Sequence, residues 1–362
     1  MTVTISPDMK HKVASTYLSW VKTRQPGRYN LAGSGVVPYS IRELAARIED
    51  VQINGQSLYG YAPLQAAIAA HCGVPGDCVV AACGTSMANF IALAVLIEPG
   101  DEVLVEEPVY EPILAVLQYL RASVRRLKRR KDANFQLPDP EESISSRTKL
   151  IIVTNLYNPS SVLVPEATLR HYGEVARRVN ARVLVDEVYL ECLYDRKATA
   201  FHYGAEFVIT SSITKAYGLG GLRCGWILAE PNLAERMWKF KDLIDPSAPH
   251  PAELLSVLAF EKLDQIAGRA KVLLERNRSL VRDFLRSCDA VECQLPDYGT
   301  CIFPRFKAGD TQRLFDVLHD RYETDIVPGR FFEMPDHFRL GIGGETATLS
   351  AGLERLAAAV KG

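Results

Sequence analysis

The chain has 362 residues, of which 48% are apolar and 23% are charged, and its formal net charge is −1. This composition is typical of a globular protein, and its length predicts two domains. The near-neutral charge gives no reason to expect nucleic acid or an anionic membrane as a partner. The longest apolar runs, such as FIALAVLI at residues 90–97, are too short to span a bilayer.

Location and metal content are predicted from the N-terminus and the cysteines. MTVTISPDMKHK at residues 1–12 lacks the apolar core of a secretion signal. The eight cysteines have no paired spacing, and the nearest approach to a cluster is Cys72, Cys78 and Cys83. These three lack the two-residue spacing of zinc sites. We therefore expect buried free thiols, no metal site and a cytoplasmic location.

The middle of the chain alternates between short apolar runs and helical patterns. Five strands are predicted in DEVLVEE (101–107), TKLIIVTN (148–155), ARVLVDEV (181–188), AEFVITSS (205–212) and RCGWILAE (223–230). Helices are predicted at 111–124 and at 165–180, where the second buries Leu169, Tyr172, Val175, Ala176 and Val179 on one face. This alternation predicts an α/β domain at about residues 45–250, with a mostly parallel sheet between helices.

The C-terminal part has a different pattern. A long helical stretch at about 251–288 leads into short strands near CIFPRF and HFRLGIG, and the helix SAGLERLAAAV follows. We predict a smaller α+β domain from residues 251–362. The N-terminal residues could pack on either domain, and we assign residues 1–44 to the smaller one. The basic run RRLKRRK at 125–131 is predicted to be an exposed strand end or loop.

Polar residues gather where the predicted strands end, which is where open α/β sheets bind ligands. Singly, each has an ordinary explanation: Asp186 could cap a helix, Asn158 could be a turn residue, and Arg223 could form a surface ion pair. Together with Tyr110, Tyr189, Ser212 and Lys215 they predict one site. In CGTS, Thr85 and Ser86 precede an apolar helix whose N-terminus would suit a phosphate.

These segments resemble those of pyridoxal-phosphate-dependent aminotransferases of fold type I, the class I/II aminotransferase family. Seven motifs follow the family's order: YGYAPLQAAIA, GTSMANF, EEPVYEP, NLYNPSS, VDEVY, SSITKAYGLGGLRCGW and FRLGIGG. The resemblance covers nearly the whole chain. It implies pyridoxal 5'-phosphate as the cofactor, bound to Lys215 as an internal aldimine (a Schiff base).

The resemblance also assigns roles to the site residues. Lys215 would move the Cα proton, Asp186 would pair with the pyridinium nitrogen, and Tyr110 would stack on the ring. The remaining cofactor contacts would be Asn158 and Tyr189 to the phenolic oxygen, and Thr85, Ser86, Ser212 and Arg223 to the phosphate. Tyr61 would reach the phosphate of a partner subunit, which implies a homodimer with shared active sites.

Substrate binding is assigned in the same way. Arg339 would grip the α-carboxylate, with Asn158 and a glycine near residues 33–35, here Gly35, beside it. The family's Asn-Pro-Thr-Gly turn is replaced by Asn158-Pro159-Ser160-Ser161, which leaves open whether the turn is kept. The N-terminal region shows no obvious second arginine for a second carboxylate, which favours neutral or aromatic amino acids.

The predicted reaction is transamination between an amino acid and a 2-oxo acid, in amino-acid metabolism. A β-eliminating lyase or an amino-acid cyclase is the alternative, because one scaffold hosts several reactions and NLAGSGVVPYS resembles branches that contain cyclases. A non-enzymatic cofactor-binding regulator is less favoured, since no DNA-binding domain is evident. A dinucleotide site is disfavoured, because GLGGLRCG lacks the spaced glycine pattern.

Overall fold

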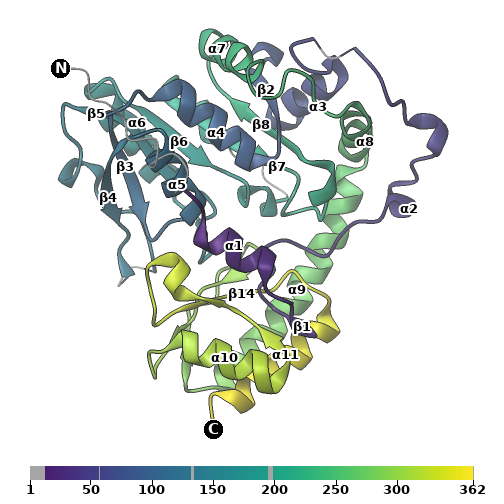
Figure 1. Cartoon of the computed structure of the whole chain (residues 1–362), viewed down its shortest axis with the longest axis vertical. Coiled ribbons are helices and arrows are strands. Elements are labelled where there is room, and N and C mark those ends of the chain that lie inside the picture. The colour runs from purple at the N-terminus through teal and green to yellow at the C-terminus, as the bar shows by residue number, and fades with distance from the viewer. Residues whose placement is uncertain (1–12, 57, 132–133, 195–198, 362) are drawn as a thin grey trace.

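A computed structural model describes residues 13–56, 58–131, 134–194 and 199–361. Residues 1–12, on which the expectation of no secretion signal rests, lie outside the described residues. Figure 1 shows a larger part built around one central sheet and a smaller part below it, with α9 running from one to the other.

The central sheet has seven strands in the order β2-β8-β7-β6-β5-β3-β4. Their bounds are β2 Val79–Cys83, β3 Glu102–Glu107, β4 Ser123–Lys128, β5 Thr148–Thr154, β6 Arg182–Asp186, β7 Phe207–Ser212 and β8 Cys224–Leu228. β8 is antiparallel to both of its neighbours, and the other neighbouring pairs are parallel. The predicted mostly parallel sheet is therefore confirmed.

The register of the sheet fixes where its polar residues lie. Asp186 is opposite Thr154 of β5 on one side and Thr210 of β7 on the other. The apolar residues of these strands are buried on both faces, which explains their near-continuous apolar sequence. The polar residues at the ends of β5, β6 and β7 consequently meet at one edge of the sheet.

Helices pack around this sheet. They are α3 Ala62–Cys72, α4 Thr85–Leu96, α5 Glu111–Tyr119, α6 Glu166–Arg178, α7 Pro231–Lys241 and α8 His250–Glu261. In α6, Leu169, Tyr172, Val175 and Ala176 are buried, as the helical period predicts. α4 packs against β7 and β8, which brings its N-terminus to the edge where β7 ends.

The smaller part combines short strands with long helices. Its helices are α9 Leu263–Ser287, α10 Thr311–Tyr322 and α11 Thr346–Ala359. β10 Cys301–Ile302, β14 Phe338–Gly341 and β13 Val327–Pro328 form an antiparallel sheet, β9 Val291–Glu292 pairs with β11 Arg305–Phe306, and β1 Tyr29–Asn30 pairs with β12 Thr324–Asp325. α1 Thr16–Thr23 lies between the two parts (Figure 1).

The predicted division into domains 45–250 and 1–44 with 251–362 stays a prediction. The long helical stretch breaks at Lys262 into α8 and α9. The core of the larger part continues to Ala267, and the core of the smaller part begins on this helix at Ala270. Hydrophobic packing therefore favours a boundary within α9 rather than before α8.

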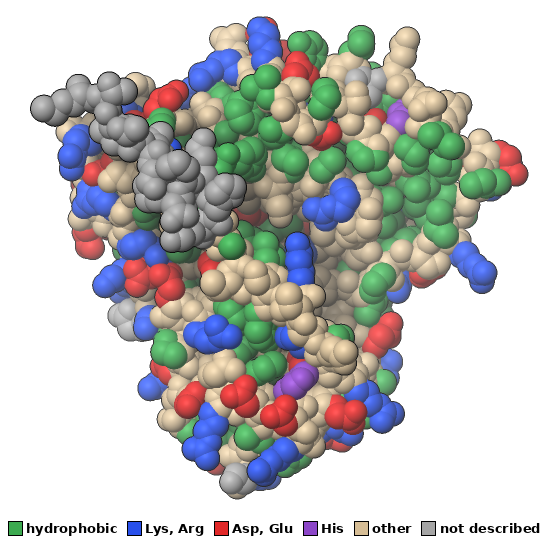
Figure 2. All heavy atoms as spheres, in the orientation of Figure 1, with side chains coloured by type: hydrophobic (Ala, Val, Ile, Leu, Met, Phe, Trp, Pro, Cys, Tyr) green, Lys and Arg blue, Asp and Glu red, His purple; other side chains and the backbone are tan. Residues whose placement is uncertain are grey.

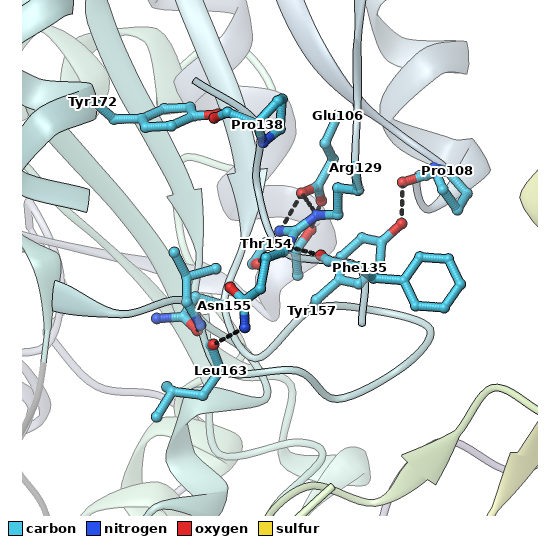
Figure 3. A network of polar contacts seen from close by, with 12 residues as sticks. Glu106, Pro108, Arg129, Phe135, Pro138, Thr154, Asn155, Tyr157, Leu163 and Tyr172 are labelled. Carbon is cyan, nitrogen blue, oxygen red and sulfur yellow. Dashed lines mark hydrogen bonds and ion pairs between the residues drawn. The ribbon is translucent and has the colours of Figure 1, made fainter. Parts of the chain in front are cut away.

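The basic run at 125–131 is only partly exposed, so the prediction of a solvated segment was wrong for one of its arginines. Arg125 on the edge strand is exposed, whereas Arg129 is buried. The guanidinium of Arg129 donates to Glu106 Oε2 from Nε at 2.8 Å and from Nη2 at 2.6 Å, and it lies 3.7 Å from the ring centroid of Tyr157. Figure 3 shows this buried pair at the centre of a polar network. A full set of partners makes its burial tolerable.

All eight cysteines are free thiols, and six of them are buried. Within the described residues, no group of His, Cys, Asp and Glu side chains could hold a metal ion. Among the helices of the described ranges, none is long and apolar enough to cross a membrane.

Candidate active site

A cavity of about 390 Å³ lies at the edge where β5, β6 and β7 end. Figure 2 shows this face of the molecule hollowed where the larger part meets the smaller. Ten of the predicted site residues line the cavity: Thr85, Ser86, Tyr110, Asn158, Asp186, Tyr189, Ser212, Lys215, Arg223 and Arg339. Tyr61 and Gly35 are not among the lining residues.

Lys215 follows β7 and projects its amine into this cavity. Its Nζ donates to Ser34 Oγ at 2.9 Å, and its carbonyl oxygen accepts from the Val36 amide at 2.9 Å. Gly35 lies directly against this lysine, because a Cβ atom at Gly35 would be 3.1 Å from the Lys215 carbonyl oxygen. Burial, and then the positive charges of Arg339 and Arg223, lower the pKa of Lys215 to about 8. The amine is therefore partly neutral near physiological pH.

Asp186 ends β6 and is held by two hydrogen bonds. Its Oδ2 accepts from Asn89 Nδ2 at 2.9 Å, and its Oδ1 accepts from the Val188 amide at 3.1 Å. Burial raises the pKa of Asp186 to about 6, against the hydrogen bond from Asn89, which favours the ionised form. Thr210 Oγ1 donates to Asn89 Oδ1 at 2.6 Å and so fixes the orientation of the amide. The carboxylate can thus pair with a cationic ring nitrogen.

Asn89 was missed by the sequence analysis, although its spacing offered a signal. It follows Thr85 by four residues in α4, and residues four apart share a helix face. Both side chains line the cavity. A polar residue at that position of an otherwise apolar helix is a sign that this face meets polar groups.

The N-terminus of α4 forms a cradle with β8. Gly84 precedes the helix with φ 79° and no side-chain cap, so the first amides of α4 are open to a ligand. A Cβ atom at Gly225 would lie 2.6 Å from the Gly84 carbonyl carbon, so glycine allows β8 to approach this turn. Arg223 reaches the same turn, where its Nη2 donates to the Cys83 carbonyl oxygen at 3.2 Å.

Hydroxyl groups complete the cradle. Thr85 Oγ1 donates to Ser212 Oγ at 2.9 Å, and Ser86 lines the cavity beside them. Thr214 Oγ1 is buried without a hydrogen-bond partner among the described residues, and no role was predicted for it. Hydroxyls, a guanidinium and a helix N-terminus are the donors that a phosphate dianion prefers. These residues therefore fit a phosphate group.

Arg339 on β14 is a buried cation whose partners are all neutral. Its Nη2 donates to Tyr17 Oη at 2.7 Å and its Nη1 to Asn158 Oδ1 at 3.3 Å, while its Nε has no partner. No carboxylate pairs with it within the described ranges. A buried guanidinium without a counter-ion is a binding site for an anion such as a carboxylate.

Two tyrosines, Tyr110 and Tyr189, line the cavity. Tyr110 lies before α5, where its ring meets Tyr17 edge to face with centroids 5.9 Å apart. Tyr189 follows β6 and is buried. Burial raises the pKa of both phenols, so both stay protonated and can donate hydrogen bonds.

The altered turn after Asn158 keeps a left-handed residue where the family has glycine. Ser161 has φ 61°, and its Oγ donates to the Cys301 carbonyl oxygen at 2.8 Å. The Tyr157 amide donates to the Val162 carbonyl oxygen at 2.9 Å and closes the turn. The turn is therefore kept. A serine held by a hydrogen bond takes the place of glycine, and Asn158 still lines the cavity.

Tyr61 stands apart from this chain's own cavity. It precedes α3, and its ring packs edge to face against His250 with centroids 4.9 Å apart. Its role toward a partner subunit stays a prediction. Tyr17 and Ser34 were missed. Tyr17 lies in no motif that the sequence analysis recognised, and Ser34 lies within NLAGSGVVPYS but was given no role there.

Comparisons with known proteins agree on one family. The family model described as aminotransferase class I and II matches residues 30–356. A capreomycidine synthase of Streptomyces vinaceus is 28% identical over 351 residues, covering 92% of this chain and 90% of the relative. An aspartate aminotransferase of Sulfolobus acidocaldarius is 22% identical over 323 residues, covering 83% of this chain and 80% of the relative.

Solved structures share the fold. A PLP-dependent aminotransferase from Streptococcus suis superimposes with a TM-score of 0.90 at 24% identity, covering 97% of this chain and 98% of that one. A PLP-dependent cyclase, OrfR, superimposes with a TM-score of 0.87 at 23% identity, covering 100% of this chain and 98% of that one.

Proposed function

The chain belongs to the aminotransferase class I and II family, whose members use pyridoxal phosphate, and on that premise we propose that it transfers an amino group between an amino acid and a 2-oxo acid. The observation that carries this proposal is the meeting of four groups in one cavity: the Lys215 amine, the Asp186 carboxylate, the phosphate cradle and the Arg339 guanidinium.

The cavity residues fit the cofactor. Thr85, Ser86, Ser212, Thr214 and Arg223 would hold its phosphate, and Asp186 would hold its ring nitrogen. Tyr110 would cover the ring face, and Asn158 and Tyr189 would meet the phenolic oxygen. When bound, the cofactor supplies an electron sink for the charge that remains at Cα after its proton leaves.

The chain's own residues would then position the substrate and move the proton. Arg339 would bind the α-carboxylate through its fork of N–H donors, which orients the Cα–H bond. Lys215, with its lowered pKa of about 8, would accept that proton and return it, since a base works best when its pKa lies near the working pH.

A β-elimination or cyclisation is the second candidate. The capreomycidine synthase relative matches 92% of this chain, and the cyclase OrfR shares its fold throughout. Both reactions begin with the same proton transfer, so the residues named above serve either one.

The two candidates differ in their need for an acceptor. We expect the purified, cofactor-loaded protein to consume more than one equivalent of an amino acid per active site only when a 2-oxo acid such as 2-oxoglutarate is present, and to form one new amino acid for each further one consumed. Consumption of the amino acid without a 2-oxo acid, with release of ammonia or a cyclic product, would establish the second candidate instead.

We further propose a homodimer with shared active sites. Ile48, Ile53 and Leu58 are each more than four-fifths exposed, and Leu243 is 78% exposed. Exposed apolar side chains of this size are typical of an interface with another subunit. Tyr61 follows this exposed stretch closely in the chain, as expected of a residue that serves a partner's site. A cytoplasmic location and a role in amino-acid metabolism stay predictions.

A further inference from the structure

Two cysteines meet beside the phosphate cradle and have no part in the proposed chemistry. Cys83 ends β2 and Cys224 begins β8, and the two residues are directly opposite each other in this antiparallel pair of strands. Both are free thiols. Side chains of directly opposite residues lie on the same face of a sheet. The register of the sheet therefore places two free thiols next to each other.

The hydrogen-bond pattern of the two strands makes this pair suitable for a disulfide. The Ala229 amide donates to the Cys78 carbonyl oxygen at 3.1 Å, and hydrogen-bonded and non-hydrogen-bonded pairs alternate from there along the strands. Cys83 and Cys224 are by this count a non-hydrogen-bonded pair, and the Cys224 carbonyl oxygen accepts from the Ile213 amide at 3.3 Å instead. The Cα atoms of such a pair lie about 4.5 Å apart, within the roughly 4.4–6.8 Å that a disulfide spans.

Cys83 is the thiol that is placed to react first. It is half-buried, whereas Cys224 is buried. Its Sγ donates to Asp245 Oδ2 at 3.5 Å, and the same oxygen lies 3.2 Å from Lys241 Nζ. Burial, and then the charge of Asp245, raise the pKa of the Cys83 thiol, so the resting thiol keeps its proton. The carboxylate can take that proton during a reaction, as a neighbouring base does for a nucleophile.

A small cavity lies against both thiols. Cys83 and Cys224 line a space of about 30 Å³ together with Ala252 and Ser256 of α8. A space of this size holds a molecule about as large as water. An oxidant that reaches both sulfur atoms therefore has to be small. Hydrogen peroxide meets this condition, whereas a bulky disulfide such as oxidised glutathione does not.

We propose that Cys83 and Cys224 are a modification site, at which hydrogen peroxide forms a disulfide between β2 and β8. Cys83 Sγ attacks one peroxide oxygen and breaks the O–O bond, while its proton passes through Asp245 to the departing hydroxide, which leaves as water. Cys224 Sγ then attacks the sulfenic acid on Cys83, and its proton leaves with the hydroxyl group as a second water. Two thiols are oxidised, and one peroxide is reduced to two waters.

This disulfide joins the two segments that carry the phosphate cradle. Cys83 directly precedes Gly84, at the turn before α4, and Cys224 directly follows Arg223. A disulfide holds its Cβ atoms about 3.8 Å apart, whereas opposite residues of an antiparallel pair have Cβ atoms about 4.5–5.5 Å apart. Oxidation therefore draws the turn and Arg223 together and changes the spacing of the phosphate donors. The effect on the cofactor rests on the proposed function, whereas the disulfide does not.

Treatment of the cofactor-loaded protein with hydrogen peroxide tests this site. The free thiols, counted after unfolding in an alkylating reagent, should fall from eight to six per chain. Peptide mass spectrometry should find the Cys83 and Cys224 peptides joined, with the loss of two hydrogen atoms. The Kd for pyridoxal phosphate should rise at least about tenfold, the cost of one misplaced contact to a charged group. Dithiothreitol should restore the eight thiols and the original Kd.

Cys293→Ser is the matched control, because Cys293 is also a half-buried free thiol and lies outside the central sheet. It should lose two thiols and change its Kd as the wild type does. Cys83→Ser should form no joined peptides and keep its Kd in peroxide, and its Kd before treatment shows whether it folds.

Three results would overturn the inference: eight remaining thiols, oxygen added to Cys83 without a bond to Cys224, or an unchanged Kd in the oxidised wild type. If the untreated protein does not bind pyridoxal phosphate, the proposed function fails, whereas the disulfide still stands or falls on the joined peptides.

Discussion

Lys215 combines a buried aliphatic stem with an amine that faces other cations. Its neighbours Arg339 and Arg223 disfavour a further positive charge, and burial acts in the same direction. Ser34 offers the amine a neutral hydrogen-bond partner instead of a carboxylate. This setting produces a nucleophilic amine and explains a lysine between two buried strands.

The lowered pKa of Lys215 predicts an altered pH dependence of its reactivity. In the cofactor-free protein, the rate of acetylation of Lys215 should rise with pH and level off above about pH 8, because only the neutral amine reacts. Lys239 is the control: it is exposed, and its hydrogen bond to Glu235 raises its pKa above 10.5, so its rate should still be rising there. Peptide mass spectrometry at each pH gives both rates.

The lowered pKa of Lys215 also makes the free energy of unfolding depend on pH. Because the folded pKa lies below the unfolded value of 10.5, the unfolded chain binds more protons between pH 8 and 10.5. The free energy of unfolding therefore decreases as pH falls from about 10.5 to about 8, and below about 8 this group causes no further change. In the acetylation experiment, identical pH profiles for Lys215 and Lys239 would show that the surroundings of Lys215 do not lower its pKa.

At the scale of elements, the phosphate cradle depends on how closely β8 approaches the N-terminus of α4. Gly225 is opposite Ala82 of β2 and Ser212 of β7, so it cannot shift without disturbing the sheet. A side chain there would meet the backbone of Gly84, which has no flexible end that could move aside.

Gly225→Ala should therefore weaken cofactor binding. We expect the Kd for pyridoxal phosphate, measured by fluorescence titration, to rise at least about tenfold, and stability to fall by about 1–3 kcal/mol because the site is overpacked. Gly268→Ala in α9 is the matched control, because nothing lies within 4 Å of a Cβ atom there. It should leave the Kd unchanged. Equal Kd values for Gly225→Ala and the wild type would show that the cradle does not hold the phosphate.

The sequence predicted the elements around the site well, for physical reasons. The ends of β5, β6 and β7 could be read from apolar runs that stop at polar residues, and parallel pairing brings those ends together. The sequence could not predict that Tyr17, Ser34 and Arg24 line the cavity, because their positions depend on how the N-terminal segment folds over the edge of the sheet. The burial of Arg129 was missed because its partner Glu106 lies on β3, 23 residues earlier in the chain, and local charge gives no sign of this pairing.

At the scale of the whole molecule, the proposed homodimer would explain two features of the surface. Tyr61 lies outside its own chain's cavity. Ile48, Ile53 and Leu58 expose apolar surface that a partner subunit would bury. A two-fold dimer is the commonest arrangement for soluble oligomers, and it would bring Tyr61 to the partner's cradle.

Mixing two inactive variants tests this sharing. Tyr61→Phe should lower activity at least about tenfold by removing a hydrogen bond to a charged group. Co-expression of Tyr61→Phe with Lys215→Ala should restore about a quarter of the wild-type activity, since half of the dimers are mixed and each mixed dimer has one intact site. Activity no higher than that of the two variants measured separately would show that Tyr61 serves its own chain or no site at all.

Borohydride reduction of the cofactor-loaded protein identifies the lysine that carries the cofactor, and we predict that this lysine is Lys215. Reduction fixes the bond between the lysine and the cofactor aldehyde, so the mass of the cofactor should appear on the peptide that contains Lys215. Lys215→Ala should lose this mass, the visible absorbance of the bound cofactor and turnover with any amino acid. Cofactor fixed to another lysine of the wild-type protein, or an alanine variant with full activity, would contradict the account.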